Sequence, residues 1–104
     1  MLEAITPHRR YAFRDNVRLR KGDGTLVNGL LIEMSLQGCR ISKLDDAEFS
    51  LDESVTVEWD SAKLKGRIRW AHRGIAGIML AEPLSAQTLA GLLARTMPDR
   101  KSAA

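Results

Sequence analysis

The chain has 104 residues and a mass of 11.5 kDa, which leaves room for one domain, since compact domains cluster at roughly 100–150 residues. Its hydrophobic content of 44% and charged content of 28% are those of a globular protein and exclude a disordered or membrane-embedded chain. The net charge is only +3, but the first 21 residues hold six Lys or Arg and two acids, whereas residues 44–61 hold seven acids and no Lys or Arg. Such a basic end can attract a phosphate-bearing ligand, although a charge run is usually just a solvated face.

The cysteine content and the N-terminal residues bear on the compartment. Cys39 is the single cysteine, which excludes an internal disulfide and fits a reducing compartment. Residues 1–6 are too short and too polar for the apolar region of a secretory signal, and the sequence has no apolar stretch long enough to span a membrane. We therefore expect a cytoplasmic protein without membrane insertion.

The N-terminal third predicts an arm followed by a hairpin. Residues 1–15 show no sustained alternation and are expected to form a flexible basic arm. From Asn16 onward, Val17 and Leu19 alternate with arginines, which predicts a first strand with one solvated face. The sequence Gly-Asp-Gly at 22–24 favours a tight turn, so a second strand over residues 25–33 would pair back on the first.

The middle of the chain predicts four more strands. Residues 35–38 read as a reversal, because Gly38 can adopt a backbone conformation closed to residues with a Cβ. Residues 43–52 form a polar, acidic connection. Strands are then predicted over 39–42, 55–60, 63–70 and 75–80, with turns at 60–61 and 72–74.

Alternation in residues 63–70 is the clearest in the chain. It places Leu64, Gly66, Ile68 and Trp70 on an inner face, and four Lys or Arg side chains on the outer face. Trp70, like Trp59, is therefore expected in the core rather than at a ligand.

The C-terminal third predicts one helix. Pro83 ends the last strand, Ser85 can cap a helix, and leucines recur at helical spacing up to Thr96. Pro98 would end the helix and leave residues 98–104 as a disordered tail. The domain would thus span residues 16–97, as an all-β, six-stranded antiparallel barrel with one C-terminal α-helix.

Enzymatic and metal chemistry find little support. His8 and His72 have no metal-binding spacing with each other or with Cys39, and Ser35 lacks the Gly-x-Ser-x-Gly elbow that exposes a nucleophile. Cys39 begins an apolar strand and is expected to be a small buried hydrophobe rather than a reactive thiol. We therefore expect neither catalysis nor a metal centre.

Two segments carry residues suited to a nucleotide. Arg10 and Arg14 are spaced by four and preceded by Arg9, and guanidinium both pairs with phosphate and stacks on purines. In the second segment, Glu33 can accept from the N1 and N2 hydrogens of guanine, and Ser35 can donate to a phosphate oxygen. Gly38 would let a ligand approach closely. A solvated arm and ordinary turn capping are the structural alternatives to these roles.

The order of these parts resembles the PilZ domain, whose signature is Arg-x-x-x-Arg in an N-terminal arm followed, after a hairpin, by (Asp/Asn)-x-Ser-x-x-Gly. The resemblance implies a six-stranded barrel with a C-terminal helix that serves as a bacterial receptor for cyclic di-GMP, without enzymatic activity or a further cofactor. The implied ligand-binding residues are Arg9, Arg10, Arg14, Glu33, Ser35 and Gly38. Glu33 departs from the expected Asp or Asn by one methylene.

The expected mechanism is that the ligand orders the arm against the barrel, which creates a surface for an unidentified effector protein. One alternative is a degenerate PilZ adaptor that binds proteins but no nucleotide. Another is single-stranded nucleic acid on the outer face formed by Lys63, Lys65, Arg67 and Arg69. Nucleic acid is disfavoured because this face lacks the aromatic side chains on which bases stack.

Overall fold

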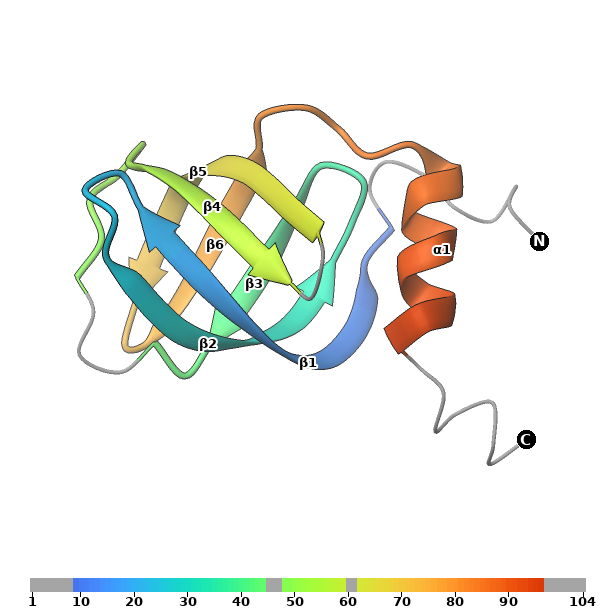
Figure 1. Ribbon diagram of the computed structural model, residues 1–104, viewed down its shortest axis with the longest axis horizontal. Coiled ribbons are helices and arrows are strands. Elements are labelled where there is room, and N and C mark those ends of the chain that lie inside the picture. Colours follow the sequence, from blue (N-terminus) through green and yellow to red (C-terminus); the bar gives the residue numbers. More distant parts are fainter. Residues whose placement is uncertain (1–8, 45–47, 60–61, 97–104) are drawn as a thin grey trace.

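Six antiparallel strands close into a barrel in the computed structural model, and a helix lies at one end of it (Figure 1). The structure describes residues 9–44, 48–59 and 62–96. The elements are β1 (Tyr11–Lys21), β2 (Leu26–Met34), β3 (Gly38–Ser42), β4 (Ser54–Trp59), β5 (Ala62–His72), β6 (Ile75–Leu80) and α1 (Ala86–Thr96). The predicted fold class is confirmed. The first eight residues of the predicted arm, the 60–61 turn and the tail over 98–104 lie outside the described residues.

Closure of the barrel depends on β1, which pairs with β2 on one side and with β4 on the other. The full order around the barrel is β1-β2-β3-β6-β5-β4. Every strand thus has a neighbour on both sides, but β1 pairs with β4 only from Arg18 to Lys21, so its first seven residues pair with β2 alone. Elsewhere around the closed barrel, a ligand or partner meets side chains and turns on its outside.

β1 begins at Tyr11, so the prediction that the first strand starts at Asn16 was wrong. The odd positions from Tyr11 onward are buried or half-buried, and Phe13 packs edge-on against Trp59 with ring centres 5.3 Å apart. Asp15 hid this alternation because it places a carboxylate at an inward position. The indole Nε1 of Trp59 donates a hydrogen bond to that carboxylate, which satisfies it inside the strand.

The turns follow their predicted chemistry at two places. Gly24 has a φ of 93° in the β1–β2 turn, and Gly74 has a φ of 81° in the β5–β6 turn, both in the left-handed region that favours glycine. Gly38 differs, because it is not among the residues with positive φ. Its own reason is steric: a Cβ at this position would lie 2.3 Å from the backbone oxygen of Ile78 on β6.

The core fills the barrel and continues under the helix. Its most deeply buried large side chains are Leu19, Leu31, Met34, Ile41, Val57, Ile68 and Leu89. Helix α1 begins as predicted, because the Ser85 hydroxyl accepts a hydrogen bond of 3.0 Å from the backbone N–H of Thr88. Leu89 and Leu92 on α1 are buried, and burial of each leucine side chain stabilises the fold by about 1.5–3 kcal/mol.

Candidate functional site

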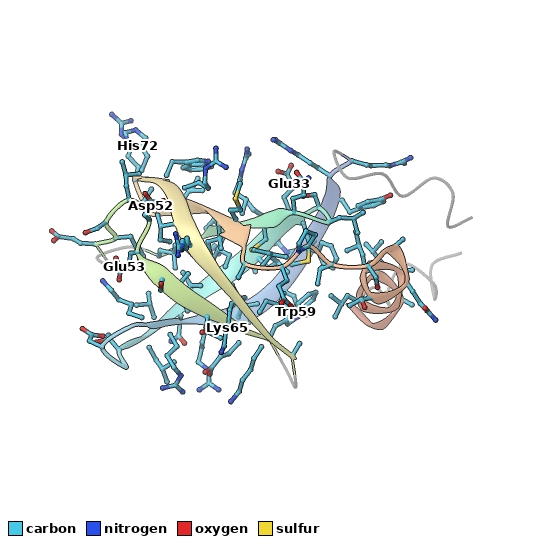
Figure 2. All side chains as sticks on the ribbon, turned by 90° about the horizontal axis from the view of Figure 1, so that it is seen from above. Glu33, Asp52, Glu53, Trp59, Lys65 and His72 are labelled. Atoms are coloured by element: carbon cyan, nitrogen blue, oxygen red, sulfur yellow. The ribbon has the colours of Figure 1, made fainter. Side chains whose placement is uncertain are left out.

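A solvent-open cavity of about 240 Å³ lies where the β2–β3 turn meets strands β3, β5 and β6. Arg10, Glu33, Ser35 and Gly38 line it, so the structure brings together four of the six residues that the sequence singled out. Figure 2 shows Glu33 on the outside of the barrel rather than in its core.

Glu33 lies between two arginines. Its Oε1 is 3.7 Å from Nη1 of Arg10, which immediately precedes β1, and 3.7 Å from Nε of Arg40 on β3. At these distances the carboxylate forms ion pairs with both arginines but no hydrogen bonds. The Arg10 side chain is 64% exposed, so an incoming anion can reach it without any rearrangement of the barrel.

Ser35 closes the β2–β3 turn. Its hydroxyl oxygen accepts hydrogen bonds of 3.2 Å from the backbone N–H groups of Gln37 and Gly38, and its own N–H donates to the Gly38 carbonyl at 2.8 Å. Ser35 therefore caps the turn, which was the alternative to a ligand-binding role, and it also lines the cavity. The hydroxyl proton has only a long contact of 3.4 Å with the Gly38 carbonyl, so it can turn toward a ligand.

The two remaining predicted residues do not line this cavity. Arg9 places its guanidinium 5.2 Å from the centre of the Tyr11 ring. Arg14 is exposed on β1, inside the stretch where the pairing of β1 with β2 shifts register between Ala12 and Asp15. Of the paired arginines of the first motif, only Arg10 faces Glu33.

Trp70 is not a core residue, and the prediction that it faces inward was wrong. The pairing of β5 with β6 shifts register between Ile68 and Trp70, and this β-bulge interrupts the strict alternation on which the prediction rested. Trp70 is 40% exposed and lines the cavity. Gly77 on β6 makes room for it, since a Cβ there would lie 2.3 Å from the indole Nε1. The Arg40 guanidinium lies 5.4 Å from the centre of the Trp70 ring system, a cation–π arrangement.

Sequence reasoning therefore missed Arg40, Arg69 and Trp70, all of which line the cavity. One signal was available: a glycine inside a strand often marks a bulge or a close approach, and Gly77 does so here. With Arg10, the cavity has three arginines and the single carboxylate of Glu33, a balance of 3 − 1 = +2 among these lining side chains. Such a wall is suited to an anion that carries about two negative charges and a flat ring.

Other chemistry is not apparent in the described part of the chain. Cys39 borders the cavity but is only 8% exposed, and burial raises the pKa of its thiol to about 12, in agreement with the predicted inert cysteine. Among the residues in 9–44, 48–59 and 62–96, no three His, Cys, Asp or Glu side chains gather as metal ligands would. Within the same residues, no helix is long and apolar enough to cross a membrane.

A protein-family model matches most of the chain. The family model described as PilZ domain matches residues 7–96, which include every described strand and the helix. No curated protein matches the chain.

Proposed function

Because this chain belongs to the PilZ domain family, a family of cyclic di-GMP-binding or adaptor domains, we propose that it is a receptor for cyclic di-GMP and binds it in the cavity beside Glu33. The observation that carries the proposal is the meeting of the two motifs. Arg10 of the first and Glu33, Ser35 and Gly38 of the second line one cavity, although a hairpin separates them in the sequence.

The charges and shape of the cavity support a dinucleotide. Cyclic di-GMP carries two phosphodiester charges, which complement the balance of +2. The cavity of about 240 Å³ is smaller than pockets that enclose a whole ligand, roughly 300–1,000 Å³, so one nucleotide would enter and the other would remain on the surface. Trp70 and the guanidinium of Arg40 offer a flat surface for a guanine.

Binding would exchange the partners of Glu33. A phosphate at Arg10 replaces the ion pair of 3.7 Å, which costs little because that pair is long and solvent-exposed. The carboxylate, still beside Arg40, can then accept from the N1 and N2 hydrogens of guanine, while the Ser35 hydroxyl donates to a phosphate oxygen. We propose that the side chains of Arg9 and Arg14 turn toward the bound ligand, and that the altered surface recruits an unidentified effector protein.

Calorimetric titration with cyclic di-GMP tests this proposal. Arg10→Ala should weaken binding about ten- to a hundredfold, because a hydrogen bond to a charged group contributes about 1.5–3 kcal/mol. Arg14→Ala should also weaken it. Arg18→Ala is the matched control, since Arg18 is exposed on β1 but does not line the cavity. No heat with the wild type, or equal affinity in the Arg10 and Arg18 variants, would refute the receptor.

The second candidate function is an adaptor that binds proteins but no nucleotide, and the ion pairs of Glu33 favour it. Its carboxylate already serves as the counter-ion of Arg10 and Arg40, so the cavity is partly neutralised from within. Glu33→Asp distinguishes the two functions, because the shorter side chain restores the family pattern and withdraws the carboxylate from the arginines. If the wild type gives no heat in the titration and the Glu33→Asp variant binds cyclic di-GMP, the adaptor function is supported.

A further inference from the structure

A second basic surface lies on the outer face of β1, β4 and β5. We name it the basic strip, and its residues are Arg18, Arg20, Lys63, Lys65 and Arg67, all exposed. The register aligns them across the three strands: Arg18 lies opposite Glu58 and Glu58 opposite Lys63, while Arg20 lies opposite Thr56 and Thr56 opposite Lys65. With strands about 4.8 Å apart and about 3.4 Å per residue, the strip covers roughly 10 by 13 Å.

One carboxylate lies within the strip. Arg20 Nε donates a hydrogen bond of 2.6 Å to Glu58, and this bond together with the nearby charges of Lys63 and Arg18 lowers the pKa of Glu58. The strip therefore holds five cations and one acid, 5 − 1 = +4. Among the described residues, no carboxylate lies within 4 Å of Lys65 or Arg67, although Glu82 lines a surface hollow together with Lys63 and Lys65.

The strip is separate from the cavity. None of its five residues lines the cavity, and the β5 bulge divides Arg67 from Arg69 and Trp70, which do. Figure 2 shows Lys65 and Glu33 on opposite sides of the barrel. A ligand beside Glu33 consequently leaves the basic strip uncovered.

The chemistry of the face narrows the class of partner. Besides the charged residues, the outward-facing side chains of this face are Asn16, Ser54 and Thr56. The face therefore has no aromatic side chain on which bases could stack and no apolar side chain that could enter a lipid bilayer. Across this face β1 pairs with β4 and β4 pairs with β5, so no strand can be added between them. The central Glu58 repels a continuous phosphate backbone but suits a surface where carboxylates surround a single donor. We propose that the basic strip is a docking surface for the acidic face of a protein partner, with carboxylates on its cations and a basic side chain at Glu58.

Two fluorescein-labelled synthetic peptides test the proposal, independently of cyclic di-GMP. One alternates Glu and Ser over 16 residues, and the other has a Lys in place of one central Ser. Anisotropy at low salt should show binding of both to the full-length protein, weakening as salt rises. The double variant Lys63→Glu/Lys65→Glu should lose affinity several-fold, up to roughly 25-fold, since each exposed pair contributes up to roughly fivefold. Lys43→Glu/Arg73→Glu is the control, because it changes net charge equally at exposed sites outside the strip.

Glu58 supplies the sharper test. The central Lys should raise affinity for the wild type roughly two- to fivefold, and this gain should vanish in Glu58→Gln. Circular dichroism confirms that each variant is folded. If the two double variants lose the same affinity for the peptides, the binding depends on net charge alone. If a 16-nucleotide oligo-dT, or phosphatidylglycerol vesicles, bind more tightly than the peptides, the strip recognises phosphate instead. Either result overturns the protein-docking assignment, and neither bears on the titration with cyclic di-GMP.

Discussion

Replacement of Gly38 by alanine should destabilise the fold, because the packing of β3 against β6 leaves no room for a Cβ at this position. An added Cβ would lie 2.3 Å from the backbone oxygen of Ile78, and backbone on a paired strand cannot move aside as a side chain can. Relief to an ordinary contact of about 3.4 Å requires β3 and β6 to separate by roughly 1 Å. The hydrogen bond of 2.8 Å from Leu80 N–H to the Gln37 carbonyl would then lengthen beyond hydrogen-bond range.

The expected cost follows from these contacts. One or two lost hydrogen bonds contribute about 1 kcal/mol each, and overpacking adds about 1–3 kcal/mol. The lower entropy of the unfolded alanine chain offsets about 0.5–1 kcal/mol. Gly38→Ala should therefore lower the free energy of unfolding by about 1–4 kcal/mol, which shifts Tm downward by at least about 4 °C in a domain of this size.

Urea unfolding followed by circular dichroism measures this change. Gly91→Ala is the matched control, since Gly91 lies in α1 with nothing within 4 Å of an added Cβ, and alanine there should stabilise the protein by about 1 kcal/mol. The same chemical substitution thus has opposite signs at the two positions. If Gly38→Ala unfolds like the wild type but no longer binds cyclic di-GMP, the packing explanation is wrong and the glycine serves the ligand alone.

Two further predictions concern titratable groups. Cys39 should resist iodoacetamide at pH 8 in the native protein and react only in urea, as followed by mass spectrometry, because burial raises the pKa of its thiol to about 12. Rapid alkylation of native protein would contradict the described burial. The lowered pKa of Glu58 means that its pairing with Arg20 stabilises the fold above the ordinary carboxyl pKa near 4.5 and is lost as pH falls through the folded value. Wild-type Tm should accordingly drop more than that of Glu58→Gln on acidification, whereas parallel curves would argue against the pair.

Much of the fold was predictable because its signals are local. Alternating hydrophobicity between turn residues indicated six strands, and β6 was predicted over the residues that form it. Ser85 identified the start of α1, since a side-chain cap depends only on the next three residues. The start of β1 was lost because Asp15 resembles a solvent-facing residue, and only Trp59, distant in sequence, makes its inward position tolerable.

The sequence predicted the side of the cavity formed by Arg10 and the β2–β3 turn, but not the side formed by Arg40, Arg69 and Trp70. Irregular strand pairing accounts for part of this difference. The pairing shifts register at three places: between Ala12 and Asp15 on β1, between Leu31 and Glu33 on β2, and between Ile68 and Trp70 on β5. The last two adjoin residues that line the cavity, and the first adjoins Arg14. In β1 the alternation runs through the shift unchanged, whereas in β2 the buried positions change from odd to even and in β5 they end at Ile68. A period-two pattern therefore assigns residues beyond the last two shifts to the wrong face.

Trp70 shows how this irregularity contributes to the site. In a regular strand it would follow Ile68 into the core, but the bulge turns it outward, and Gly77 on the neighbouring strand leaves the space into which its ring settles. Arg40 then stacks on that ring and faces Glu33 from β3. The hollow thus exists because bulged strands depart from the uniform outer surface of a closed barrel, and the departure that hides these residues from sequence patterns is the same one that brings them together.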